Sequence, residues 1–153
     1  ISVMSGEQDR IDIAQAAAQQ LREVGIHCTV DIPAVMDWGG QMACLIGWGS
    51  PFDADDHTYK VFGTDKGANY SGYSNAEVDE ALTKARESSD PAVRKQYYDE
   101  FQVALANDPA YAFICYIDAN YVATSRLHGI DAETVMGHHG VGIFWNVETW
   151  TLD

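Results

Sequence analysis

The chain has 153 residues, which is enough for one globular domain with a hydrophobic core and short for two. Hydrophobic residues make up 46% of it and charged residues 21%, so its composition is that of a globular protein and excludes a disordered chain. No apolar run approaches the ~18 residues of a transmembrane helix, and the formal net charge of −14 argues against nucleic acid and anionic membranes as partners.

The start of the chain has the pattern of a β-α-β unit. Ile1 to Ser5 reads as a short strand, and Ser5 with Gln8 forms a capping-box pattern that opens a helix. Apolar residues then recur at helical spacing: Ile11, Ala14, Ala18, Leu21 and Val24. Gly25 predicts the end of this helix, and Ile26 to Ile32 alternates as a half-buried strand. We expect the two strands to be parallel, because such crossovers are right-handed.

A third apolar run follows a loop that spans Pro33 to Met42. Ala43 to Ile46 predicts a central strand buried on both faces, and Gly47 ends it. In open α/β sheets ligands bind beyond such strand ends, where aromatic rings offer flat surfaces and glycines permit close approach. The predicted ligand-binding residues are Trp48, Gly49, Ser50, Pro51, Phe52 and Asp53. The alternative is a core tryptophan followed by an ordinary turn.

Acidic residues follow this segment and have two interpretations. Residues 53–56 cap a short helix from His57 to Phe62, which ends in the run from Gly63 to Gly67. The same carboxylates with His57 also have the chemistry of metal ligands. A calcium loop requires glycine and glutamate at the positions that Thr58 and Thr64 occupy, so capping is the favoured interpretation.

Two further helices and two strands are predicted in the second half. Ser74 with Glu77 forms a second capping box, before a helix whose buried face is Val78, Ala81, Leu82 and Ala85. Asp90-Pro91 opens the next helix, which Asn107-Asp-Pro109 stops. Its apolar face is Val93, Tyr97, Phe101, Ala104 and Leu105. Tyr111 to Ile117 is rich in aromatic and branched residues and predicts a strand, as does Tyr121 to Thr124.

Reactive residues give little support for catalysis. Cys28, Cys44 and Cys115 lie in apolar runs without a C-x-x-C pair, so buried free thiols are favoured over one disulfide, and a thiolate zinc site is not expected. His138 and His139 are adjacent and point to opposite faces if extended, so at most one reaches a given site. No nucleophile elbow, H-E-x-x-H helix or phosphate loop is present, and we expect no enzyme.

Several segments, in this order, resemble a known family. They are Gly25-Ile-His-Cys-Thr-Val, Leu45-Ile-Gly-Trp-Gly, Asn69-Tyr-Ser-Gly-Tyr-Ser-Asn75, Asp90-Pro-Ala-Val-Arg-Lys, Tyr111-Ala-Phe-Ile-Cys-Tyr and Trp145-Asn-Val-Glu. The chain is similar to the second large lobe of extracytoplasmic solute-binding proteins for dipeptides, oligopeptides and nickel, which feed ABC importers. The resemblance covers nearly the whole chain, and the segment that begins at Asn69 is quite specific.

The resemblance implies an α/β fold, namely a type II periplasmic-binding-protein-like lobe with a mixed β-sheet flanked by helices. Residues 1–153 then form a single ligand-binding lobe, and an N-terminal lobe of the same protein is missing. The two lobes would close around a small peptide or a nickel chelate, and an ABC permease would recognise the closed form. No cofactor is implied beyond such a chelate as ligand. The location implied is extracytoplasmic, in the periplasm or, as a lipoprotein, on the outer face of the cell membrane.

The resemblance also bears on the ligand. Peptide-binding members carry an amine-binding aspartate where this chain has Pro51, whereas nickel-binding members carry Trp-Gly-Ala-Pro-Tyr-Asp, which is close to Trp48 to Asp53. Their tryptophan and tyrosine contact the metal complex, and Phe52 keeps the ring without the hydroxyl. In some of those members a histidine beyond this loop is the metal ligand, and none matches it here: His57 is close but on the wrong side of the short helix, and Lys66 is nearer the expected place.

Two points stay open at this stage. Relatives have a helix of roughly ten residues where this chain has Gly39-Gly40, so a deletion or a missing segment is implied there. The alternative function is a stand-alone α/β module that binds a protein surface and no small molecule. The sequence does not decide between peptide, nickel complex or another ligand.

Overall fold

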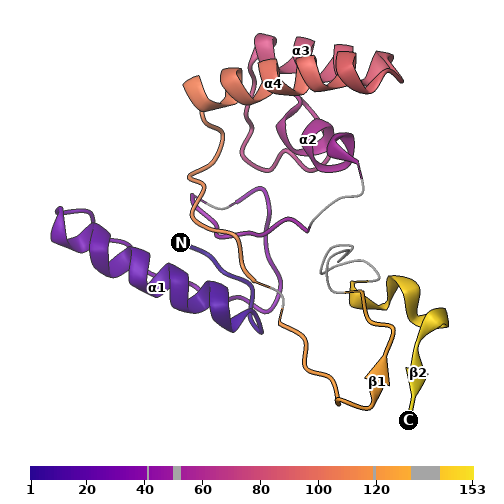
Figure 1. Ribbon diagram of the computed structural model, residues 1–153. Coiled ribbons are helices and arrows are strands. Elements are labelled where there is room, and N and C mark those ends of the chain that lie inside the picture. Colours follow the sequence, from indigo (N-terminus) through magenta and orange to yellow (C-terminus); the bar gives the residue numbers. More distant parts are fainter. Residues whose placement is uncertain (41, 50–52, 119, 132–141) are drawn as a thin grey trace. The chain divides into compact units, whose positions relative to one another are not determined.

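The structure is a computed structural model that describes residues 1–40, 42–49, 53–118, 120–131 and 142–153 (Figure 1). The elements of these residues are α1 (Gln8–Glu23), α2 (Ala54–Phe62), α3 (Ala76–Glu87), α4 (Pro91–Asn107), β1 (Leu127–His128), the 3₁₀ helix η1 (Ile143–Thr149) and β2 (Thr151–Leu152). The chain divides into two compact units, Ile1–Trp48 and Gly49–Asp153, and each is considered by itself. Within the described ranges no helix is both long and apolar enough to cross a membrane.

The first unit pairs three chain segments in parallel. Ser2 forms parallel bridges with Asp31 on one side and Cys44 on the other. The Val3 amide donates to the Asp31 carbonyl at 2.9 Å, and the Leu45 amide donates to the Ser2 carbonyl at 3.0 Å. The predicted parallel β-α-β arrangement is confirmed, although the contacts are single bridges rather than continuous strands.

Helix α1 connects the first two of these segments and buries Ile11, Ala14 and Ala18. It begins after Glu7 with no side-chain cap, so the predicted capping box from Ser5 is wrong. The reason is that the Ser5 amide donates to the Pro33 carbonyl at 3.0 Å, which keeps Ser5 in the paired segment. The end at Gly25 is confirmed: its φ of 84° is a left-handed conformation that glycine adopts without strain.

The segment predicted as the buried central strand does not occupy that place. Ala43 is exposed and Cys44 to Ile46 are half-buried, so the prediction of burial on both faces is wrong. The middle position belongs to the first segment, where Val3 is fully buried and bonds run to both neighbours. Order along the chain gives no information on this lateral order, which depends on pairing between distant residues.

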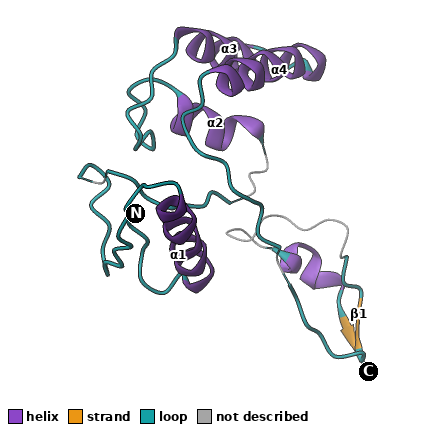
Figure 2. Cartoon of the chain, turned by 90° about the vertical axis from the view of Figure 1, so that its left-hand side faces the viewer, coloured by secondary structure: helices purple, strands orange, loops and turns teal. Residues whose placement is uncertain are grey.

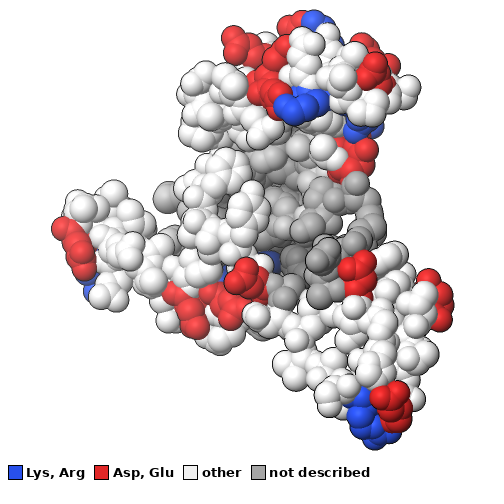
Figure 3. Space-filling view, in the orientation of Figure 1, with Lys and Arg blue, Asp and Glu red and all other residues white. Residues whose placement is uncertain are grey.

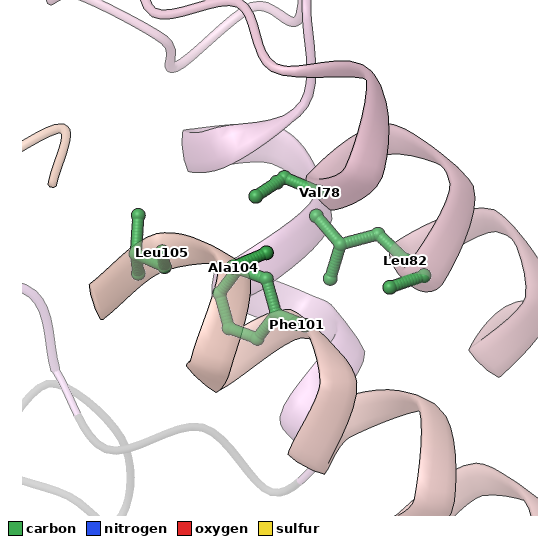
Figure 4. Packing of buried hydrophobic residues seen from close by; sticks show 6 residues of the cluster. Val78, Leu82, Phe101, Ala104 and Leu105 are labelled. Atoms are coloured by element: carbon green, nitrogen blue, oxygen red, sulfur yellow. The ribbon is translucent and has the colours of Figure 1, made fainter. Parts of the chain in front are cut away.

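Helices α3 and α4 form the best-packed part of the second unit (Figure 4). Leu82 and Val78 of α3 face Phe101, Ala104 and Leu105 of α4, and all five are buried. The buried face of α3 contains the four predicted residues, Val78, Ala81, Leu82 and Ala85. Figure 2 shows the two helices side by side with α2 next to them, and partly buried rings of α2 pack against the same core.

The caps of these helices show why they start where they do. Asp90 accepts from the Ala92 amide at 2.8 Å with Pro91 in the first turn, as predicted. The N-cap of α3 is Asn75, whose Oδ1 accepts from the Glu77 amide at 2.9 Å and also from the next amide, so the predicted cap at Ser74 is one residue early. Asparagine and serine are comparable caps, so the sequence pattern alone does not separate them.

The predicted strands from Tyr111 to Ile117 and from Tyr121 to Thr124 are absent from the described residues in these ranges. Large apolar side chains are exposed there: Phe113, Ile114, Tyr116, Ile117, Tyr121 and Val122. Ring contacts of Tyr111 and Phe113 with Phe62 anchor the start of the run. A strand requires a neighbour for its backbone groups, and the described chain supplies none along this run.

The chain end forms a small antiparallel pair, with Leu127 opposite Leu152 and His128 opposite Thr151. Asn146, in the Trp145-Asn-Val-Glu segment, links the residues around this strand pair by hydrogen bonds. The side-chain Nδ2 of Asn146 donates to the Gly129 carbonyl at 2.9 Å, and Oδ1 of the same side chain accepts from the Trp150 indole at 2.9 Å. A Cβ on Gly129 would lie 2.9 Å from the Thr149 carbonyl oxygen, so this position requires glycine.

Candidate ligand-binding site

The predicted ligand-binding residues are described in part. Trp48 is half-buried at the end of the first unit, Gly49 is half-buried at the start of the second, and Asp53 is exposed. Ser50, Pro51 and Phe52 lie outside the described residues. The half-buried Trp48 differs from a fully enclosed core tryptophan, since part of its indole surface is accessible.

The glycine before Trp48 is closely approached by a side chain. A Cβ on Gly47 would lie 2.6 Å from the Arg10 guanidinium nitrogen Nη2. Arg10 is itself held by an ion pair with Glu7 at 2.9 Å. The sequence interpretation expected glycines at this strand end to permit close approach, and at Gly47 the approaching group is a side chain of α1.

Asp53 fulfils the predicted role of helix cap. Its Oδ1 accepts from the Asp55 amide at 2.8 Å and from Nη2 of Arg94 at 2.5 Å. The backbone hydrogen bond, followed by the arginine contact, lowers the pKa of the Asp53 carboxyl below its ordinary value. The charged carboxylate therefore joins the start of α2 to α4, a contact between residues distant in sequence that the pattern did not predict.

The other acidic residues near it also have cationic partners. Asp55 pairs with Arg86 of α3 at 3.0 Å, and Asp56 pairs with Lys60 one turn along α2 at 2.9 Å. The hydrogen bond from Lys60 lowers the pKa of Asp56. Over the described ranges no three ligand-type side chains gather as a metal site would require. The capping interpretation is thus confirmed for Asp53, whereas Asp55 and Asp56 lie inside α2 and form ion pairs that the sequence pattern did not predict.

The segment from Asn69 to Ser74 is a loop fastened by its first residue. Nδ2 of Asn69 donates to the Gly63 carbonyl at 2.9 Å and to the Tyr73 carbonyl at 2.7 Å, while its Oδ1 accepts from the Tyr73 amide at 3.1 Å. The Tyr73 hydroxyl donates to the Asp108 carbonyl at 2.9 Å, and partial burial raises the pKa of this tyrosine. These bonds give the most specific sequence motif a structural role.

Residues on either side of this loop are also joined to α3 and to the end of α4 by hydrogen bonds. Thr64 donates to Asp79 twice, from its amide at 2.8 Å and from its hydroxyl at 2.6 Å. Asn75 also reaches Asp108 at the end of α4, at 2.9 Å. Sequence reasoning missed these partners because each lies fifteen or more residues away.

The cysteines and histidines add no site in the described residues. All three cysteines are free, and partial burial raises the pKa of the Cys44 thiol. Cys115 is exposed, so the expectation that it is buried is wrong. Its segment lacks the neighbouring strand that would cover it. His138 and His139 lie outside the described residues.

Two open hollows lie elsewhere on the surface. One, of about 500 Å³, lies over α3 and α4 and is lined by Glu77, Glu80, Asp99 and Glu100 among others. The other, of about 640 Å³, lies between α1 and residues 28–30. Over α3 and α4 acidic and basic side chains lie beside one another (Figure 3), and Lys84 neutralises Glu80 at 2.6 Å. Of the predicted ligand-binding residues that the structure describes, Trp48, Gly49 and Asp53, none lines either hollow.

The sequence and structure of the chain were compared with those of known proteins. No family model matches the chain. The chain is 35% identical to Protein XP55 of Streptomyces lividans over 136 residues, which cover 84% of this chain and 25% of XP55. It is 29% identical to the oligopeptide-binding protein AppA of Bacillus subtilis over 164 aligned positions, covering 96% of this chain and 28% of AppA.

Solved structures agree. NikZ from Campylobacter jejuni, crystallised with Ni(L-His), matches 98% of this chain and 32% of its own with a TM-score of 0.79 and 36% identity. AppA in complex with a nonapeptide matches 99% of this chain and 31% of its own with a TM-score of 0.67 and 26% identity. The chain belongs to the solute-binding family for dipeptides, oligopeptides and nickel.

The likeness confirms the predicted fold class, a solute-binding-protein-like α/β fold. NikZ and AppA are themselves binding proteins, which is consistent with the expectation that this chain is not an enzyme. The chain spans about a quarter of the length of these curated relatives and about a third of the solved chains. The ligand and the partners of the whole protein are therefore proposals.

Proposed function

We propose that the chain is one lobe of a two-lobed solute-binding protein, which encloses a small peptide or a chelated nickel ion and delivers it to an ABC permease. The observation that carries this proposal is the likeness to NikZ with its bound Ni(L-His), over 98% of the chain. Closure removes water from the ligand and strengthens each polar contact, and no bond of the ligand is broken. The protein acts outside the cytoplasmic membrane.

The proposed ligand surface is the segment from Trp48 to Asp53. Its first residue supplies an indole that is only half-buried, which leaves ring area for stacking on a ligand. Phe52 adds a second ring by sequence, and Pro51 removes the carboxylate that would pair with a peptide amine. The combination favours a nickel chelate, which brings its own donor atoms, over a peptide held by its free amine.

The proposed partner lobe is supported by a run of exposed large apolar side chains in the described ranges 113–118 and 120–122. Single exposed apolar residues are normal on a protein surface, but a contiguous run of large ones marks a buried contact in the complete protein. Because the chain is about a third as long as its solved relatives, the remainder of such a protein is available to cover this run.

Calorimetry on the complete two-lobed protein tests the proposal. Titration with nickel–histidine and with a peptide library is expected to give binding to at least one of the two. Trp48→Ala is expected to weaken that binding by ~1–3 kcal/mol, because the ring would lose its contact with the ligand. The matched control is Trp38→Ala, in the loop before the third paired segment, which is expected to leave the affinity unchanged.

Two outcomes contradict the proposal. Absence of binding to both ligand classes removes the transport function, and unchanged affinity in Trp48→Ala removes this residue from the ligand surface. The same exposed apolar run is also what a stand-alone protein-interaction module would present. Sedimentation of the isolated chain with and without the rest of the protein separates the two: failure of the rest of the protein to associate favours the module.

A further inference from the structure

We propose that Tyr59, Lys66 and Arg86 form a binding site for a carboxylate anion on the second unit. The three residues belong to helix α2, to the loop that follows it and to the last turn of helix α3. All three are described, and the site requires neither the segment from Trp48 to Asp53 nor a contact between the two units. The site goes beyond the proposed function, on which only one arm of its test rests.

Two cationic side chains lie against the ring of Tyr59. The Arg86 guanidinium carbon is 3.8 Å from the ring centre, and the Lys66 ammonium is 4.8 Å from it. Hydrogen bonding from Lys66 and, to a smaller extent, from Arg86 lowers the pKa of the Tyr59 phenol, so both cations lie near its hydroxyl group as well as its ring. Three hydrogen-bond donors, an ammonium, a guanidinium and a phenol, therefore meet at one place.

Lys66 differs from the other lysines of the chain. Lys60, Lys84 and Lys95 each pair with a carboxylate four residues away, at 2.9, 2.6 and 2.5 Å. No carboxylate of the described residues forms such an ion pair with Lys66, whose ammonium rests on the tyrosine ring instead. The pattern that neutralises the other lysines is therefore missing at this one.

The loop that carries Lys66 holds its side chain in place. The Lys66 amide donates to the Gly63 carbonyl at 3.3 Å, and its own carbonyl accepts from the Asn69 amide at 3.0 Å. The aliphatic part of the side chain lies across Gly63, where an added Cβ would come within 2.9 Å of the lysine Cγ. A side chain that is already restricted loses less conformational entropy when it binds an anion.

The charges around Tyr59 favour a carboxylate as the ligand. Arg86 pairs with Asp55 through Nε at 3.0 Å, so within the described residues Lys66 adds a second cation without a second carboxylate. A local excess of one positive charge attracts an anion, all the more in a chain whose net charge is −14. A carboxylate carries the one negative charge that is needed, and its two oxygens accept from two donors at once.

Two probes applied to the complete two-lobed protein separate the possible sources of the carboxylate. Acetate tests a free anion: compared with chloride at equal ionic strength, it is expected to raise the pKa of Tyr59, because a bound carboxylate offsets the cations and disfavours the phenolate. The pKa is followed by absorbance at 295 nm, as the difference between the wild type and Tyr59→Phe.

The second probe tests a carboxylate of the transported solute and rests on the proposed function. Calorimetry compares nickel–histidine with nickel–histidinamide, and a peptide with the same peptide amidated at its C-terminus. If the solute supplies the carboxylate, the wild type is expected to bind the acid form about fivefold more tightly than the amide, the scale of one exposed ion pair.

A second lysine provides a matched control. Lys84 also lies near a tyrosine ring, at 5.7 Å from the centre of Tyr97, but its ammonium is already paired with Glu80. Lys66→Met is expected to abolish the acetate effect and the preference for the acid form, whereas Lys84→Met is expected to keep both. Lys66→Arg, which retains the charge, is expected to keep them in part.

The outcomes distinguish this site from the proposed function. A response to either probe that Lys66→Met removes and Lys84→Met keeps supports the site and identifies the source of the carboxylate. The absence of a response to both probes, or an equal loss in Lys66→Met and Lys84→Met, overturns the site while the proposed function stands. If the wild type binds neither nickel–histidine nor peptides, the proposed function fails, and the acetate measurement alone decides on the site.

Discussion

The helix pair α3–α4 and the run from Tyr111 to Thr124 are both rich in apolar residues, yet only the helices bury them. Helix hydrogen bonds are local, and the partner of α3 follows it after a short connection that ends at Asp90. The run from Tyr111 needs backbone partners from elsewhere, and its large apolar side chains in the described ranges 113–118 and 120–122 are exposed. The difference shows that an apolar sequence pattern forms a packed helix or strand only where the same chain supplies the residues that pack or pair with it.

The largest expected effect is on the packed helix pair α3–α4. Leu82→Ala is expected to destabilise the second unit by ~2–5 kcal/mol, because Leu82 is fully buried and its loss leaves a cavity. Urea unfolding followed by far-UV circular dichroism measures the change. Val103→Ala on α4 is the control, at 63% exposure, with an expected change within ~0.5 kcal/mol. Equal effects of the two would mean that α3 and α4 do not pack in this way.

The second prediction addresses the exposed side. Ile114 is 57% exposed, so Ile114→Ala is expected to have little effect on the stability of this chain alone. In the complete two-lobed protein the same change is expected to cost ~2–5 kcal/mol, if the missing lobe buries the side chain. Urea unfolding of both forms measures the difference. A small effect in the complete protein would show that the run remains exposed there.

The smallest expected effect concerns a cap within the helical part. Asn75→Ala is expected to cost ~1 kcal/mol, because two amides at the start of α3 lose their acceptor and Asp108 loses a donor. Ser74→Ala serves as the control and tests the corrected cap position, with a smaller expected loss. Thermal unfolding measures the stability of the two variants. A larger loss of stability in Ser74→Ala would show that Ser74 is the cap, as the capping box predicts.

The sequence predicted those features of the candidate site that depend on local structure. The sequence indicated Trp48 as an aromatic residue beyond a strand end and Asp53 as a cap, and the described structure has a half-buried indole and a capping carboxylate there. It gave no sign of Arg94, which lies 41 positions from Asp53. The ligand role of the segment stays a prediction, to be measured on the complete protein.

By itself, the sequence determined what depends on neighbours along the chain: the helices, the proline and glycine that start and stop them, the buried face of α3, and the family through its ordered motifs. Tertiary structure alone decided the lateral order of the paired segments, the exposure of the run from Tyr111, and the arginine that holds Asp53. The physical reason is range. Helical hydrogen bonds and caps close within a few residues, whereas strand pairing, burial and ion pairs between helices join groups whose separation in sequence carries no pattern.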